Sequence, residues 1–292
     1  MSIVNTQEPL PFVASSEVFT KTYKSLSERY SGENRCNSFP HIVVSPIHYE
    51  SGYAYPLIVW LHDAGKSEQE IVEVAPKISS RNYVAVAPRG LKSFQKRIVR
   101  SFVNGRLVDK KSWEEPCNNW TESDEDVSEA ENLVFDAITE ACAKYNVNRR
   151  RIFLLGRGTG GSMALRVAMR NPDYFAGVAS IDGALPSLNK TPFRKWRFLR
   201  DLPVLITVGD SASTTVPRLD MQMLRLYHTA GLTVLVRQYN EDPTQANSEQ
   251  TRMSSILADV NRWIMERTLN PQTTPCDMFV QHGQKENSQV RR

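Results

Sequence analysis

The sequence predicts an α/β fold, with a mainly parallel sheet flanked by helices on both faces. Three observations support this class. Short runs that are apolar throughout recur along the chain, which is typical of strands buried on both faces of a sheet. Segments with helical periodicity separate these runs, and such alternation is the pattern of a parallel sheet. No internal repeat or convincing linker interrupts the alternation, so we expect one domain.

The first half of the chain begins with a polar, weakly patterned segment, residues 1–37, in which a helix is expected over Val18–Tyr30. Strands are then predicted at residues 41–44, 56–62 and 83–88, and helices over Glu68–Ile78 and Asp124–Tyr145. Residues 91–120 are polar and are predicted to form an irregular excursion over one end of the sheet.

The second half continues the same alternation. Strands are predicted at residues 152–155, 175–182, 203–209 and 233–239, and helices at residues 162–170, 217–230 and 254–269. A basic and aromatic loop is expected at residues 183–201, and residues 270–292 are expected to form a disordered tail. The predicted domain therefore spans residues 38–269.

A glycine-rich turn, Gly156-Arg-Gly-Thr-Gly-Gly161, joins a predicted strand to a predicted helix. Two kinds of site use this order: the nucleophile elbow G-x-S-x-G and the dinucleotide fingerprint G-x-G-x-x-G. The letters match the second pattern, and Asp182 follows about 20 residues later, where a ribose-binding acid belongs. Nucleotide binding through Gly156–Gly161 is therefore one alternative, although three candidate strands precede the motif. The elbow pattern is missed by one residue, because Gly158 stands at the serine position.

Composition and charge exclude several classes of protein. The net charge is only +4, and acidic residues follow the basic ones near residues 92–111, so a nucleic-acid partner is not expected. The four cysteines, Cys36, Cys117, Cys142 and Cys276, lack metal-ligand spacing and are expected to be free thiols. We expect no metal and no cofactor. The first residues do not resemble a signal peptide, and no apolar run is long enough to cross a bilayer, so we expect a cytoplasmic protein.

Five segments resemble the α/β-hydrolase fold in its carboxylesterase and phospholipase branch. They are residues 56–65, 145–156, 171–180, 203–210 and 258–265, which follow one another in the family's order and together span about residues 40–268. The resemblance implies a hydrolase of carboxylic esters that acts on a small-molecule substrate. In such enzymes a serine attacks the ester carbonyl, a histidine takes its proton, and an acid orients the histidine.

The resemblance also implies where these three residues should lie, and each position is substituted. Gly158 stands at the serine position. The family acid is expected near Ala212 or Ser213, so Asp210 is close but offset. The loop that should carry the histidine, residues 240–246, contains none. Removing such a triad costs on the order of 10⁶ in rate. We therefore predict a catalytically degenerate member, a pseudoenzyme.

The family's oxyanion-hole turn, His-Gly-x-Gly, becomes His62-Asp63-Ala64-Gly65. An oxyanion-like hole would be formed around Asp63, Ala64 and Thr159. An ionised Asp63 about 4 Å from a developing oxyanion would oppose ester hydrolysis by about 4 kcal/mol at an effective dielectric near 20. Alternatively, Asp63 caps the helix that starts near Glu68. His62 is expected to be a structural turn histidine rather than a catalytic base.

Two further hypotheses remain open. Thr159 or Ser162 could replace the missing nucleophile, although capping of the helix N-terminus explains both hydroxyl groups without chemistry. A non-catalytic, regulatory role is the other hypothesis, in which the turn binds a small carboxylate or phosphate. Its ligand-binding candidates are His62, Arg157, Gly158 and Thr159, because a guanidinium and several N–H groups at a helix N-terminus favour anions.

Overall fold

The computed structural model describes residues 40–103, 106–186, 199–209, 221–229, 231–239 and 248–269. The described strands are β1 (His41–Val44), β2 (Tyr55–Leu61), β3 (Val84–Pro88), β4 (Leu91–Val103), β5 (Arg106–Asn119), β6 (Val147–Arg157), β7 (Gly177–Ile181), β8 (Val204–Gly209) and β9 (Val234–Tyr239). The described helices are α2 (Glu70–Ile78), α3 (Asp124–Lys144), α4 (Thr159–Arg170), α6 (Met221–Thr229) and α7 (Ser248–Leu269).

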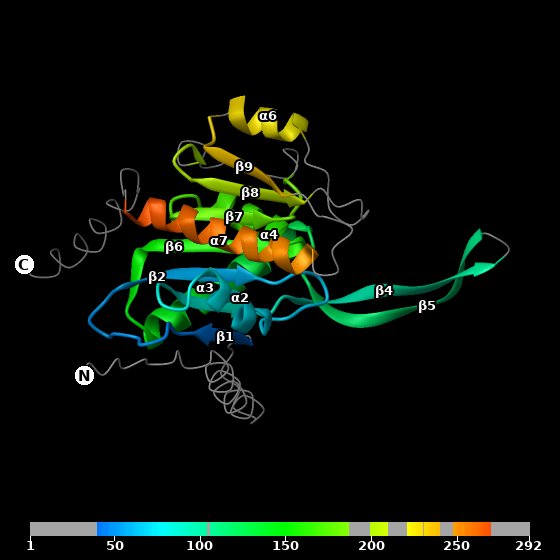
Figure 1. Ribbon diagram of the computed structural model, residues 1–292, viewed down its shortest axis with the longest axis horizontal. Helices are drawn as coiled ribbons and strands as arrows, with labels where there is room; N and C mark the ends of the chain where they lie inside the picture. Colours follow the sequence, from blue (N-terminus) through cyan, green and yellow to red (C-terminus); the bar gives the residue numbers. More distant parts are fainter. Residues whose placement is uncertain are drawn as a thin grey trace, which may run out of the picture. The chain divides into compact units, whose positions relative to one another are not determined.

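Seven strands form one sheet in the order β1-β3-β2-β6-β7-β8-β9 (Figure 1). Strand β1 pairs antiparallel with β3, and all other neighbours in this sheet are parallel. The predicted fold class is therefore confirmed. The parallel strands end at one edge of the sheet, where the loops that follow them come together, and this is the edge at which α/β proteins place their sites.

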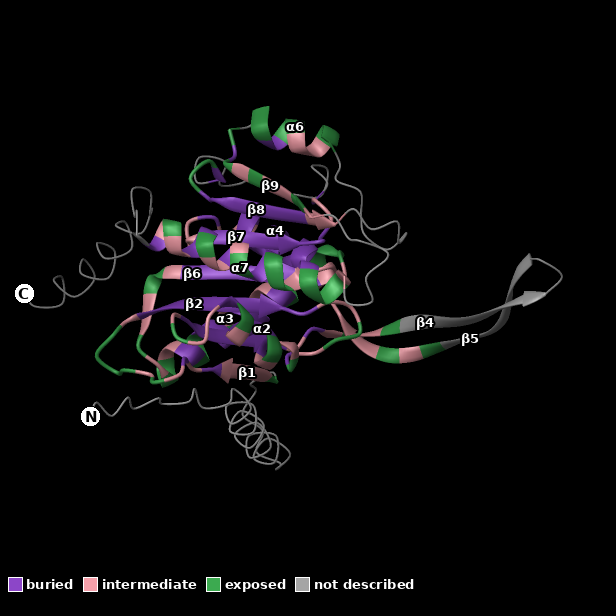
Figure 2. Cartoon of the chain, viewed as in Figure 1, coloured by how far each residue is buried: buried purple, intermediate pink, exposed green. Residues whose placement is uncertain are grey.

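The strands of the sheet centre are apolar because both faces are covered. All seven residues of β2 are buried (Figure 2). Neighbouring residues of β6 point to opposite faces: Ile152 and Leu154 join the core cluster that includes α3 and α4. Phe153 instead packs edge-on against Trp263 of α7, with ring centroids 6.0 Å apart. Continuous apolar runs are the expected signature of strands in this position.

The segment before α3 differs from its prediction. Residues 91–120 were expected to be irregular, but β4 and β5 form an antiparallel hairpin from Leu91 paired with Asn119 to Val103 paired with Arg106. Figure 1 shows it as a two-stranded ribbon that extends away from the seven-stranded sheet. The polar composition of these residues misled the prediction. The sequence signal that could have revealed it is Asn104-Gly105, a dipeptide typical of tight hairpin turns.

Two helices begin earlier than predicted, for tertiary reasons. Helix α4 starts at Thr159 rather than residue 162, although glycine disfavours helices, because its first turn must lie close to β2. A side chain at Gly160 would come within 2.2 Å of the Leu61 carbonyl oxygen. Helix α7 starts at Ser248 rather than residue 254. The buried side chain of Arg252 attaches the polar first turns of this helix to the protein interior.

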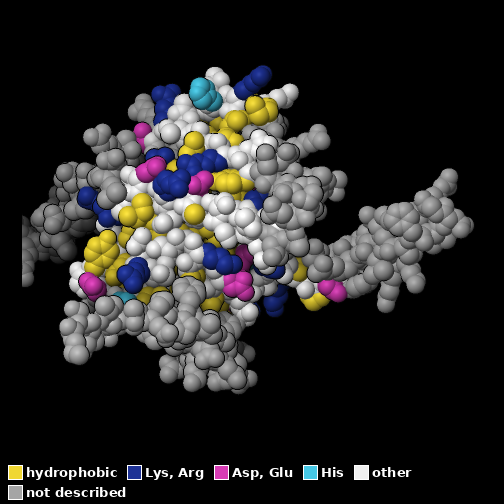
Figure 3. Space-filling model, in the orientation of Figure 1, with side chains coloured by type: hydrophobic (Ala, Val, Ile, Leu, Met, Phe, Trp, Pro, Cys, Tyr) yellow, Lys and Arg dark blue, Asp and Glu magenta, His cyan; other side chains and the backbone are white. Residues whose placement is uncertain are grey.

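Several predictions lie outside the described residues. They are the segment 1–37 with its helix Val18–Tyr30, Asp210, the loop 240–246, most of the basic and aromatic loop, and the tail 270–292. Among the helices that the structure describes, none is long and apolar enough to span a bilayer. On the face shown in Figure 3, basic and acidic side chains of the described residues lie interspersed.

Candidate functional site

The glycine-rich turn lies at the carboxyl edge of the sheet, between β6 and α4. Gly158 has φ 54° and ψ −120°, a combination that residues with a Cβ atom adopt only under strain. The strand, the sharp turn and the helix together have the architecture of a nucleophile elbow. The residue at its apex has no side chain, so the elbow presents backbone where a nucleophile would stand.

The glycines beside Gly158 are explained by packing within the chain. A Cβ atom at Gly156 would lie 2.4 Å from the Gly160 carbonyl oxygen. At Gly161 it would lie 2.8 Å from Ser180 Oγ. The turn therefore needs glycines because other parts of the chain lie close to it. A bound pyrophosphate is not required to explain them.

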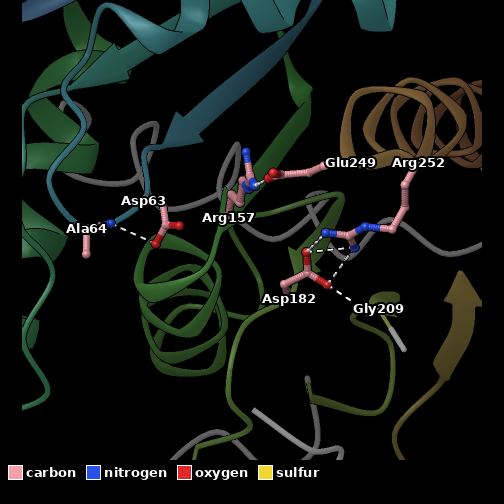
Figure 4. A network of polar contacts seen from close by, with 7 residues as sticks. All are labelled: Asp63, Ala64, Arg157, Asp182, Gly209, Glu249 and Arg252. Atoms are coloured by element: carbon pink, nitrogen blue, oxygen red, sulfur yellow. Dashed lines mark hydrogen bonds and ion pairs between the residues drawn. The ribbon is translucent and has the colours of Figure 1, made fainter. Parts of the chain in front are cut away.

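Asp63 faces the turn. Its Oδ1 atom accepts hydrogen bonds from the backbone N–H of Ala64 at 2.7 Å and of Thr159 at 3.2 Å (Figure 4 shows the contact with Ala64). A Cβ atom at Gly158 would lie 2.0 Å from this oxygen. The alternative in which Asp63 caps the helix near Glu68 is therefore wrong. Instead its carboxylate binds at the N-terminus of α4, where the helix dipole favours negative charge.

His62 is fully buried and uses both ring nitrogens in the turn. Nδ1 donates to the Asp63 carbonyl at 2.8 Å, and Nε2 accepts from the Gly90 N–H at 2.9 Å. Burial lowers the pKa of His62, and the bond to the Asp63 carbonyl offsets only part of this effect. The ring is therefore neutral at pH 7, and a ligand could contact it only by replacing one of these hydrogen bonds.

Arg157, a predicted anion ligand, pairs with Glu249 of α7 (Figure 4). The two side chains are 24% and 64% exposed, so the ion pair lies at the surface and is weak. Its guanidinium charge is nonetheless partly neutralised within the molecule, which leaves less attraction for an external anion.

Asp182 forms a buried ion pair that the sequence did not reveal. Both of its oxygens accept from the guanidinium of Arg252 at 2.9–3.1 Å, and Oδ1 also accepts from the Gly209 N–H at 3.0 Å (Figure 4). Asp182 has φ 54°, so the backbone as well as the side chain is held in place. The carboxylate is thereby committed to Arg252, and it is not available to a ribose hydroxyl as the nucleotide alternative requires.

The two candidate replacement nucleophiles have different surroundings. Ser162 Oγ donates to the Gly158 carbonyl at 3.3 Å and accepts from the Ala184 N–H at 2.8 Å. Thr159 Oγ1 is buried and has no hydrogen-bond partner among the described residues. Neither hydroxyl caps α4, because Gly158 is its N-cap, so the capping explanation is wrong for both.

A polar pocket of about 620 Å³ opens beside the turn, between the loop after β2, the start of α2, the base of the hairpin and the end of β6. Its lining includes Lys66, Glu70, Glu73, Glu115, Cys117 and Arg157. Glu70 accepts a hydrogen bond from Trp60 Nε1 at 2.9 Å. Among the residues that the structure describes, no group of three or more His, Cys, Asp or Glu side chains could hold a metal ion.

Comparisons with known proteins agree on one family. A family model described as Phospholipase/Carboxylesterase matches residues 44–264. Over 156 residues the chain is 32% identical to the "Putative esterase NocK" of Nocardia uniformis subsp. tsuyamanensis. That match covers 53% of this chain and 40% of the relative, so the chain spans less than half of that protein's length.

Solved structures show the same fold. SOBER1 of Arabidopsis thaliana superposes with a TM-score of 0.52 at 18% identity, covering 74% of this chain and 100% of that chain. A carboxylesterase of Bacillus cereus gives a TM-score of 0.52 at 15% identity, covering 81% of this chain and 97% of that chain. At such identities the likeness concerns the fold alone.

Proposed function

Because the chain belongs to the phospholipase/carboxylesterase family of α/β-hydrolases, we propose that it is a pseudoenzyme, a member that no longer hydrolyses esters by the serine route. The observation that carries this proposal is the elbow itself. Gly158 occupies its apex in the strained conformation of a nucleophile, and glycine has no group that can attack a carbonyl.

The oxyanion hole supports the same proposal. In this fold the hole is made by the N–H of the residue after the nucleophile and by an N–H from the loop after an earlier strand. Here these groups belong to Thr159 and Ala64, and both already donate to Asp63. An ester carbonyl would meet a carboxylate in place of two free donors, which opposes the charge that develops in the transition state.

A substitute nucleophile has little support from the geometry. A hydroxyl group needs an adjacent base to become nucleophilic. Ser162 Oγ is bound to two backbone groups, and Thr159 Oγ1 has no partner in the described part of the chain. Among the described residues, neither hydroxyl therefore contacts a proton acceptor of the kind that a histidine provides.

The test is hydrolysis of p-nitrophenyl acetate and butyrate by the purified protein, with a serine-bearing carboxylesterase as positive control. We expect no turnover above buffer, and no change in Thr159→Val or Ser162→Ala variants. Turnover by the wild type that either substitution abolishes would refute the proposal and identify the nucleophile. Labelling with a fluorophosphonate, followed by peptide mapping, is an independent readout of a reactive hydroxyl.

The non-catalytic role that we propose is binding of a small molecule at the carboxyl edge of the sheet. The polar pocket supports it, since such sites are concave and lie where the loops after parallel strands meet. An anion at the glycine turn itself is opposed by Asp63 and by the pairing of Arg157 with Glu249. Nucleotide binding is opposed by the packing of the turn glycines within the chain and by the pairing of Asp182 with Arg252.

We propose the cytoplasm as the location. Cys117 and Cys142 are free thiols, which suits a reducing compartment. Fractionation of cells that express the tagged chain tests this proposal, and recovery from an extracellular or membrane fraction would contradict it.

A further inference from the structure

The backbone N–H groups of Ala64 and Thr159 form an anion hole, and the Asp63 carboxylate occupies it. Ala64 N and Thr159 N lie 2.7 and 3.2 Å from Asp63 Oδ1, which is close to the 2.7–3.1 Å at which such donors stabilise an oxyanion. The donors come from two segments far apart in the sequence, the loop after β2 and the start of α4. A carboxylate oxygen is thus bound where a ligand's oxygen would bind.

Asp63 also fills the space above Gly158. A Cβ atom there would meet Oδ1, Cγ and Oδ2 of Asp63 at 2.0, 2.4 and 2.8 Å. The glycine and the aspartate are therefore sterically coupled, since any larger residue at position 158 must displace the carboxylate. The site around them is only half-buried, so an anion could reach the two N–H groups if Asp63 were removed.

We propose that Asp63 is a built-in ligand that keeps a site for small carboxylate anions closed. The Ala64 and Thr159 N–H groups form that site, and the Asp63 carboxylate excludes other anions by occupying it and by charge repulsion. This inference rests on the proposed function, because a catalytic site would need the same N–H groups to be free.

Titration with acetate tests the occupancy directly. Asp63→Ala removes the occupant and its charge, so we expect its Kd for acetate, measured by calorimetry, to be at least about tenfold lower than that of the wild type. Asp63→Asn keeps an oxygen that can accept from both N–H groups, and we expect it to stay closed. Glu140→Ala is the matched control, because it removes an exposed carboxylate of α3 that does not line the polar pocket, and it should leave acetate binding unchanged.

A folded Asp63→Ala protein that binds acetate no better than the wild type would overturn the proposal, and so would an equal gain in Glu140→Ala. Circular dichroism and a thermal melt establish that each variant is folded. The outcome is distinct from that of the esterase assay. Ester turnover by the wild type contradicts the proposed function even if Asp63→Ala gains acetate binding, whereas a failed acetate titration without turnover contradicts this inference alone.

A double-mutant cycle tests the steric coupling without any ligand. Gly158→Ser should destabilise the wild type strongly, and the same change should cost much less in an Asp63→Gly background, where the space is empty. Urea unfolding of the four proteins measures the coupling. If Gly158→Ser costs the same in both backgrounds, Asp63 does not occupy that space and the proposal is wrong.

Discussion

Arg252 and Asp182 show how single residues hold the carboxyl edge of this sheet together. Their side chains are 4% and 8% exposed, and they join α7 to the residue after β7. A buried ion pair is not by itself a source of large net stability, because both charges lose their hydration. Removal of one partner is nevertheless costly, since it leaves the other charge buried and unpaired.

We therefore predict that Arg252→Met lowers the free energy of unfolding by about 3–5 kcal/mol. The matched control is Arg262→Met on the same helix, since Arg262 is 64% exposed and pairs with Asp259 three residues earlier. That change should cost less than about 1 kcal/mol. Urea unfolding followed by circular dichroism measures both, and similar losses would show that the buried pair has no special weight.

His62 gives the protein a defined response to acid. Burial holds its pKa below the ordinary value of 6.5, so the unfolded chain binds a proton at this ring at higher pH than the folded chain does. Stability from this residue is complete above about pH 6.5 and is lost as the pH falls from there toward the lowered pKa. Nitrogen NMR of the His62 ring should give a titration midpoint below pH 6.5, and a midpoint at or above that pH would contradict the prediction.

At the scale of elements, α3 illustrates a helix whose start is encoded locally. Ser123 is its N-cap, and Ser123 Oγ accepts from the Asp126 N–H at 3.1 Å. Three acidic residues follow in the first turn, where the helix dipole favours them. The sequence therefore placed this helix boundary correctly.

Ser123→Ala should lower the free energy of unfolding by about 1 kcal/mol, because the first turn of α3 loses its cap. Ser254→Ala is the control, since Ser254 is exposed within α7 and its hydroxyl donates to the Gln250 carbonyl of the same helix. We expect its effect to stay within about 0.5 kcal/mol. Chemical denaturation distinguishes the two, and equal effects would argue against capping.

The β4–β5 hairpin shares no strand with the seven-stranded sheet. Its base is nevertheless attached to the loop after β2, because Gly65 N donates to the Asn118 carbonyl at 3.0 Å and Asn118 Nδ2 donates to the Lys66 carbonyl at 3.3 Å. The sheet should therefore fold without the outer hairpin, provided that the base is kept.

Replacement of residues 95–115 by an Asn-Gly turn tests this independence. It joins Phe94 to Pro116, which are already paired across the hairpin. We expect a cooperative melt with a Tm within about 4 °C of the wild type, as for a change below about 1 kcal/mol. Loss of cooperative unfolding would mean that the hairpin is part of the core.

For the whole molecule, the sequence predicted the fold class and the order of the strands of the seven-stranded sheet, because buried parallel strands leave a clear apolar pattern. It missed the β4–β5 hairpin, which lies outside this sheet. It failed where distant contacts decide local structure. The first turn of α4 depends on the close approach of Gly160 to Leu61, and the first turns of α7 depend on Arg252. Neither contact joins residues at a fixed spacing, so no sequence motif indicates it.

The candidate site was predictable to the same degree. The position of Gly158 at the elbow followed from the strand–turn–helix pattern, and the structure has that geometry. The direction of Asp63 was left open, because a sequence does not state where a side chain points. The ion pair of Asp182 with Arg252 joins residues 70 positions apart, and no motif connects them.

The hairpin also carries the chain's excess of positive charge. Residues 91–119 contain seven Lys and Arg against three Asp and Glu, an excess that equals the chain's entire net charge of +4. Without them, the rest of the chain has balanced charges. The replacement of residues 95–115 removes six Lys and Arg with three Asp and Glu, which lowers the net charge from +4 to +1. The shortened protein should therefore elute from a cation-exchange column at lower salt than the full chain, and its approach to any negatively charged surface should depend less on ionic strength.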